Sequence, residues 1–238
     1  MIKALCFRDL QIISGLLLSL WGNIAFADDG GISLGQTRVI FNEADRARTV
    51  MIKNGGDKTY LIQSLVQLGS DNQQAAPFIV TPPLFRLEPN SRNSLRIMRQ
   101  NERQLSQQHE SVFYLSVLAI PAQTAEVTEQ AQLSMGIRFL IKLFYRPEGL
   151  SMTPEEAYCK LQFTQVANGV RVENPTPYFL TLGQLSINHR AISFEQQSAM
   201  IAPHGNQIFP VTAPLALADW RMITDYGILS PKCEYSPP

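Results

Sequence analysis

One long alternating segment, residues 133–147, constrains the fold of this chain more than any other stretch. It reads LSMGIRFLIKLFYRP, and apolar side chains occupy its alternate positions, at Leu133, Met135, Ile137, Phe139 and Ile141. A period of two over this length predicts an extended strand with one continuous apolar row. Pro147 cannot donate a ladder hydrogen bond, so we expect the strand to end there. Such a strand either packs inside a sandwich or offers an edge on which another chain can pair.

Residues 1–27 have the pattern of a signal peptide. Lys3 and Arg8 make the start positive, an apolar run follows from Ile12 to Trp21, and Ala25 to Ala27 have the small-residue pattern of a cleavage site. The apolar run is shorter than the roughly 20 residues that a spanning helix needs, so we expect cleavage rather than the alternative, a membrane anchor. The remaining 211 of 238 residues would begin at Asp28 and be exported.

The chain without this segment is almost neutral and keeps two cysteines. Removal of Lys3, Arg8 and Asp9 reduces the 20 basic and 20 acidic residues to 18 and 19. This balance argues against nucleic acid or an anionic membrane as the main partner. In an oxidising compartment we expect Cys159 and Cys233 to form a disulfide, with free buried thiols as the alternative.

Short alternating segments separated by turn residues fill the rest of the chain. The expected strands are 32–34, 37–41, 49–53, 60–68, 78–87, 94–98 and 112–120 before the long strand, and 160–165, 169–173, 178–188 and 207–212 after it. Asn54 to Asp57 reads as a hairpin turn with positive φ angles. Strands at intervals of roughly ten residues, with hardly any helical periodicity, are typical of immunoglobulin-like sandwiches.

A change of pattern at Pro147 to Glu156 predicts a boundary between two domains. We therefore expect an all-β protein of two immunoglobulin-like β-sandwich domains, residues 28–148 and 149–238. A cleft between the two domains would be the natural binding place.

Catalytic and metal-binding patterns are weak in this sequence. His109, His189 and His204 have no metal-ligand spacing, and no serine elbow or glycine-rich phosphate loop is present. No pair of acids has convincing spacing for hydrolysis, and Trp220 is the single tryptophan after residue 27. We expect a binding protein without a metal, a cofactor or a small-molecule substrate.

Two basic residues interrupt apolar strands, Arg38 in the segment 37–41 and Lys142 in the long strand. A buried cation must find an anion or lose its charge, and Asp and Glu are scarce around both positions. Each cation could pair with an internal carboxylate or extend to the surface. If the two converge, they would form a receptor for a carboxylate.

Six motifs together resemble the periplasmic pilus chaperones of the chaperone-usher pathway. In chain order they are TRVIF at Thr37 to Phe41, TPPLFRLEP at Thr81 to Pro89, HESVFYLSVLAIP at His109 to Pro121, IKLFYRP at Ile141 to Pro147, NPTPYFLTL at Asn174 to Leu182 and ITDYG at Ile223 to Gly227. They cover both halves of the chain in the family's order. The connection from Pro121 to Gln132 is similar to that of the subgroup with the shorter loop.

The resemblance implies an L-shaped pair of domains in the periplasm that binds one pilus subunit and delivers it to an outer-membrane usher. The subunit would receive the long strand along its open edge, which is donor-strand complementation. The roles implied for single residues are a clamp on the subunit's C-terminal carboxylate by Arg38 and Lys142, apolar plugs at Leu133, Met135 and Ile137, and a salt-bridged interdomain lock of Glu110, Arg146 and Asp225.

Several alternatives stay open at this point. The apolar row of the long strand could face its own core, and free copies could pair through this strand. The chain could itself be a fimbrial subunit or adhesin, although Asp28 to Gly31 is too short to donate a strand. An exported carbohydrate-binding or hydrolytic module is the third alternative.

Overall fold

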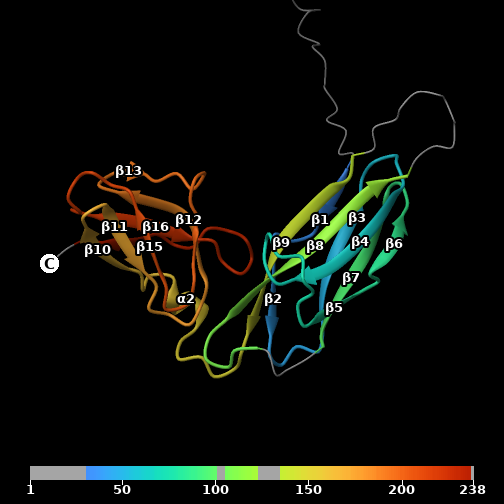
Figure 1. The fold of residues 1–238 in the computed structure, drawn as a ribbon, viewed down its shortest axis with the longest axis horizontal. Helices are drawn as coiled ribbons and strands as arrows, with labels where there is room; N and C mark the ends of the chain where they lie inside the picture. Colours follow the sequence, from blue (N-terminus) through green and yellow to red (C-terminus); the bar gives the residue numbers. More distant parts are fainter. Residues whose placement is uncertain (1–30, 101–104, 123–134, 237–238) are drawn as a thin grey trace, which may run out of the picture. The chain divides into compact units, whose positions relative to one another are not determined.

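The structure is a computed structural model that describes residues 31–100, 105–122 and 135–236 (Figure 1). The expected signal peptide, Leu133 and most of the connection 121–132 lie outside the described residues. The described residues form two β-sandwiches, each with its own hydrophobic core. No helix in these ranges is long and apolar enough to cross a membrane. The exact domain limits at residues 27, 148 and 238 stay predictions.

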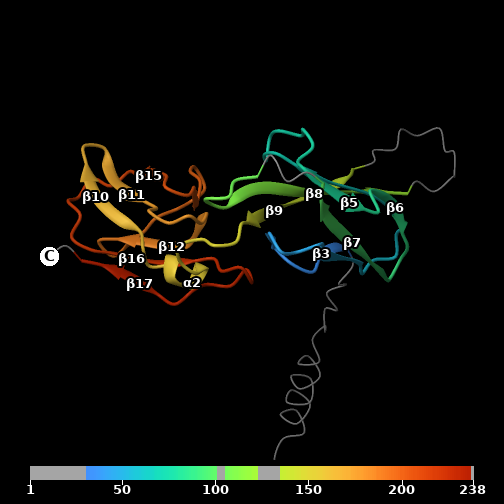
Figure 2. The ribbon, with the colours of Figure 1, turned by 90° about the horizontal axis from the view of Figure 1, so that it is seen from below.

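The first sandwich consists of two sheets that cover opposite sides of one core. One sheet has the order β1-β3-β7-β5, with β1 at Ile32–Leu34, β3 at Arg48–Asn54, β7 at Ser91–Arg99 and β5 at Phe78–Thr81. The other has the order β2-β9-β8-β4-β6, with β2 at Arg38–Asn42, β9 at Ile137–Arg146, β8 at Ser111–Pro121, β4 at Tyr60–Gln67 and β6 at Leu84–Leu87. In Figure 2, β3 and β8 lie in different layers.

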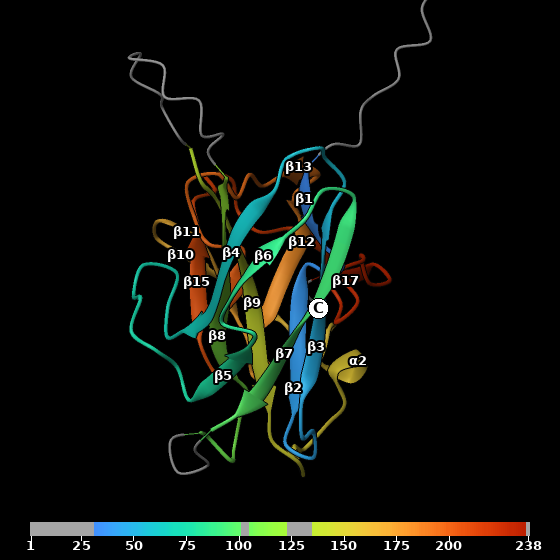
Figure 3. The same cartoon turned by 90° about the vertical axis from the view of Figure 1, so that its right-hand side faces the viewer.

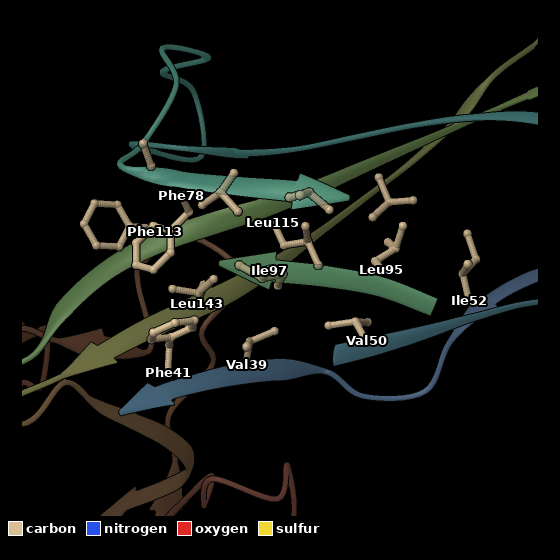
Figure 4. Packing of buried hydrophobic residues seen from close by; sticks show 14 of the residues in the cluster. Val39, Phe41, Val50, Ile52, Phe78, Leu95, Ile97, Phe113, Leu115 and Leu143 are labelled. Carbon is tan, nitrogen blue, oxygen red and sulfur yellow. The ribbon is translucent and has the colours of Figure 1, made fainter. Parts of the chain in front are cut away.

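Alternating side chains from both sheets fill the core of this sandwich, as the period of two predicts. In β3, Val50 and Ile52 point inward while Met51 between them is exposed. Figure 4 shows these residues beside Leu95 and Ile97 of β7, the neighbouring strand of the same sheet. At one end of the core, the ring of Phe78 packs edge-on against two other phenylalanines, with centroid distances of 5.3 Å to both Phe41 and Phe113.

The expected hairpin at Asn54 to Asp57 was wrong. β3 pairs with β1 and β7, whereas β4 belongs to the other sheet, so the segment carries the chain from one sheet to the other. Neither Gly55 nor Gly56 has a positive φ. The buried amide of Asn54 holds the crossing instead, because it donates to the carbonyls of Lys58 at 2.7 Å and Glu88 at 2.9 Å.

The second sandwich begins after one short helix, α2 at Pro154–Ala157, which the sequence reasoning did not expect. One sheet has the order β10-β11-β15, with β10 at Gln162–Val166, β11 at Gly169–Glu173 and β15 at Asn206–Phe209. The other has the order β13-β12-β16-β17, with β13 at Arg190–Ala191, β12 at Leu180–Ile187, β16 at Ala218–Met222 and β17 at Cys233–Tyr235. β14, at Met200–Ile201, also pairs with β12. A disulfide joins Cys159 to Cys233, with a Cα separation of 5.3 Å.

Candidate carboxylate site and open strand edge

Arg38 and Lys142 lie side by side at the start of a parallel strand pair. β2 runs parallel to β9, and the register pairs Arg38 with Lys142, followed by Val39 with Leu143. Figure 3 shows the two strands adjacent to each other. β2 begins at Arg38, so the pairing of β9 with β2 begins at this pair of cations. The two cations singled out in the sequence therefore do converge.

Neither cation is neutralised by a close carboxylate. Within the described ranges, the side chain of Lys142 has no hydrogen bond or ion pair. Arg38 donates from Nη1 to the carbonyl of Ile223 at 3.1 Å, while its buried Nε has no partner. A buried N–H without an acceptor costs free energy, so this guanidinium can gain stability by donating to a further group.

Burial and the nearby like charge also make the protonated form of Lys142 less favourable. Burial, together with the charge of Arg38, lowers the pKa of Lys142 below its ordinary value. Burial lowers the pKa of Arg38 as well, and the carboxylate of Asp225 offsets part of this effect. A bound anion between the two would relieve the repulsion and replace lost solvation, because an opposite charge favours the protonated form of both groups.

The first half of β9 offers an open strand edge that leads to this cation pair. β8 pairs with β9 from Ile137 to Tyr145, whereas β2 pairs only with the segment from Lys142 to Arg146. No strand among the described residues pairs with Ile137 to Ile141 on the β2 side. Backbone N–H and C=O groups on this side are therefore available to an added strand.

The apolar row of β9 passes from the core of the first sandwich into solvent. Phe139 and Ile141 pack against that core, but Ile137 is 49% exposed and Met135 is 72% exposed. Leu133, the third expected plug, lies outside the described residues. Ile137 and Met135 are thus placed where another molecule could cover them, and not inside their own domain.

Glu110, Arg146 and Asp225 form one ion-paired group that connects the two sandwiches. The guanidinium of Arg146 donates from Nε to Glu110 at 2.7 Å, and from both terminal nitrogens to Asp225 at 2.7 and 3.0 Å. The other oxygen of Glu110, which is 2% exposed, accepts the backbone N–H of Phe179 at 2.9 Å. Each buried oxygen of Glu110 therefore has a donor, which is the condition under which a buried ion pair is tolerated.

Sequence reasoning missed two residues near the cation pair. Arg48 and Tyr226 line a cavity of about 430 Å³ together with Arg38. Arg48 opens strand β3, and Tyr226 belongs to the motif ITDYG, in which only Asp225 was assigned a role. A cation at a strand end and an aromatic residue in a turn are ordinary features, so the sequence gives no signal for either.

Comparison with known proteins gives two matching families. Residues 31–151 match the pili and flagellar-assembly chaperone family, PapD N-terminal domain, and residues 156–234 match the pili assembly chaperone PapD, C-terminal domain. Chaperone protein FimC of Escherichia coli is 34% identical over 223 residues, which are 93% of this chain and 90% of FimC. The probable fimbrial chaperone ElfD of the same species is 39% identical over 209 residues, 87% of each chain.

Solved structures agree with these sequence matches. The chaperone DraB of Escherichia coli superimposes with a TM-score of 0.76 at 32% identity, covering 87% of this chain and 98% of DraB. A chain of the complex of the Salmonella enterica SafA pilin with the SafB chaperone gives a TM-score of 0.77 at 29% identity, with coverages of 87% and 97%. The similarity thus extends through both sandwiches.

Proposed function

Because the chain belongs to the PapD family of pilus-assembly chaperones, we propose that it binds pilus subunits by donor-strand complementation and delivers them to an outer-membrane usher. The family match favours this function over that of a fimbrial subunit or adhesin. The protein would act in the periplasm after cleavage of residues 1–27. It would act by binding, without a catalytic step.

The observation that carries this proposal is a pair of cations that lacks a close carboxylate and lies at the end of an open strand edge. Arg38 and Lys142 would clamp the C-terminal carboxylate of the subunit, since both have donors free for an anion. Charge-assisted hydrogen bonds of this kind are roughly twice as strong as neutral ones. A clamp at one end of the edge also sets the register of the added strand, which main-chain hydrogen bonds alone leave undefined.

The direction of the bound strand follows from the same geometry. Its last residue would lie beside β9 just before Lys142, because Arg38 already occupies the position opposite Lys142, and the rest would extend along β9 toward Ile137. The subunit strand would therefore run parallel to β9. It would occupy, beside the first half of β9, the position that β2 occupies beside the second half.

The exposed end of the apolar row supplies burial. Met135 and Ile137, with Leu133, would enter the gap left by the missing strand of the subunit sandwich. Full burial of a side chain of this size contributes on the order of 1.5–3 kcal/mol. The group of Glu110, Arg146 and Asp225 would hold the two sandwiches together while the subunit is bound.

Alanine substitutions of Arg38 and Lys142 test the clamp. Arg38→Ala or Lys142→Ala, co-expressed in the periplasm with a cognate pilus subunit, should remain folded but lose co-purification of that subunit. Loss of one member of a charge-assisted contact removes about 2–5 kcal/mol of binding, roughly 30-fold or more in affinity. Lys53→Ala, at an exposed position of β3, is the matched control and should retain the subunit. Normal recovery with both clamp variants would refute the proposal.

A further inference from the structure

The cavity beside Arg38 is polar. It has a volume of about 430 Å³, and its wall includes the hydrogen-bonding side chains of Gln36, Thr37, Asn42, Arg48 and Tyr226. Ile40 is the single aliphatic side chain on this wall. A polar wall of this kind favours a ligand group that replaces the hydrogen bonds lost with water.

Arg48 is the cation on this wall that is most available to a ligand. Arg146 is held by Glu110 and Asp225, and Arg38 belongs to the proposed clamp. Arg48, by contrast, has only a loose ion pair, with 3.7 Å between its Nε and Oδ2 of Asp45. The same oxygen of Asp45 already accepts the backbone N–H of Asn42 at 2.8 Å. The guanidinium of Arg48 can therefore donate to a new acceptor.

The backbone of the turn that carries Tyr226 is held at a fixed place relative to Arg38. This tight turn is closed by a hydrogen bond of 2.9 Å from the N–H of Gly227 to the carbonyl of Thr224. Gly227 has a φ of 79° and lies so close to Thr37 that a Cβ there would collide with the hydroxyl. On the other side of Tyr226, Asp225 binds Arg146, and the carbonyl of Ile223 accepts from Arg38.

The tip of this turn is exposed although it is well held. Tyr226 is 88% exposed, the largest exposed fraction among the large apolar side chains of the described residues. A tyrosine side chain has only two χ angles, so little conformational entropy is lost when a partner covers it.

Resting on the proposed function, we propose that this cavity receives the side chain of the last residue of the bound subunit. Arg48 and Tyr226 would select a terminal side chain that accepts hydrogen bonds, an amide or a carboxylate. The last residue is the one adjacent to the cavity, because the bound strand ends at Arg38. An apolar terminal side chain would displace water from Arg48 and from the Tyr226 hydroxyl, and it could not replace the hydrogen bonds that the water made.

The test uses the protein from residue 28 onward and three synthetic peptides with alternating apolar residues and a free C-terminal carboxylate. The peptides differ only in the last residue, which is Gln, Glu or Leu. We expect the Gln and Glu peptides to bind about tenfold more tightly than the Leu peptide, as calorimetry would measure. Arg48→Met should remove this preference and Tyr226→Phe should reduce it. The matched control Arg46→Met, which changes a cation two residues away that does not line the cavity, should retain it.

Two results separate this inference from the proposed function. Equal binding of the three peptides by the unmodified protein, or an unchanged preference in Arg48→Met, overturns the terminal side-chain site. In that case Arg38→Ala must still lose all three peptides if the proposed function is correct. Unchanged binding of all three peptides by Arg38→Ala overturns both. Thermal unfolding of each variant shows whether a loss of binding reflects a loss of folded protein.

Discussion

At the scale of single residues, charge inside an apolar strand is the signal that sequence reasoning could use. Arg38 and Lys142 stand out because their neighbours are apolar and acids are scarce, and the structure makes them register partners. Arg48 and Tyr226 could not be found in this way. Their importance comes from a cavity that residues distant in sequence build together, and no local pattern encodes such a cavity.

Lys142→Met should stabilise the free protein near neutral pH. Burial and the charge of Arg38 lower the pKa of Lys142 in the folded state. The Lys142 side chain therefore binds its proton less tightly in the folded state than in the unfolded state, in which its pKa is near 10.5. The cost to stability is complete below the folded-state pKa and fades as the pH rises through 10.5. Lys142 remains partly open to solvent, so we expect a gain of at most about 1 kcal/mol, which raises the melting temperature by no more than roughly 2–4 °C.

Thermal unfolding between about pH 7 and pH 11 measures this effect. The difference between Lys142→Met and the unmodified protein should shrink as the pH rises. Lys53→Met, at an exposed site on β3, should show no such trend. Two outcomes would contradict a stability cost from the charged Lys142. Lys142→Met could be less stable than the unmodified protein at neutral pH, or it could be more stable by the same amount at every pH.

At the scale of elements, strand positions were easier to predict than strand partners. The expected strand 169–173 coincides with β11, and the burial of Val50 and Ile52 follows from alternation. The pairing of β2 with β9 could not be predicted, because alternation shows which face of a strand is apolar and not which strand lies beside it. The hairpin expected at Asn54 to Asp57 failed for the same reason, since its flanking strands belong to different sheets.

Two alanine substitutions in β9 should separate binding from folding. Leu143 is fully buried, so Leu143→Ala should lower the free energy of unfolding by about 2–5 kcal/mol. Ile137 is half exposed, so Ile137→Ala should change stability by less than about 1 kcal/mol. The same substitution at Ile137 should weaken subunit binding about tenfold, because the burial of this side chain takes place in the complex.

Urea unfolding and subunit titration give both quantities for each variant. Gly136 precedes Ile137, and a Cβ at this position would meet only ordinary contacts, so Gly136→Ala serves as a control that leaves the edge in place. A large loss of stability in Ile137→Ala with unchanged subunit affinity would place this side chain in its own core and would contradict the plug role.

At the scale of the whole molecule, contacts between the two sandwiches lie beside the cation pair and the cavity. Glu110 accepts from the backbone of Phe179, and the backbone N–H of Glu110 donates to the carbonyl of Pro177 at 2.9 Å. The ring of Phe144, next to Arg38, packs against Phe179 with a centroid distance of 6.0 Å. Of the residues in these contacts, the resemblance to a family indicated only Glu110, and the sequence gives no signal for the others because they lie far apart along the chain.

In the proposed complex, Arg38 and Lys142 bind a chain end and not merely an extended strand. The most direct measurement is the affinity of the protein for a peptide with the sequence of the last strand of a cognate subunit, prepared as the free carboxylate and as the amide. We predict that amidation weakens binding to the unmodified protein roughly 30-fold or more and has little effect in Arg38→Ala. Equal affinity of the unmodified protein for the carboxylate and the amide would contradict the account.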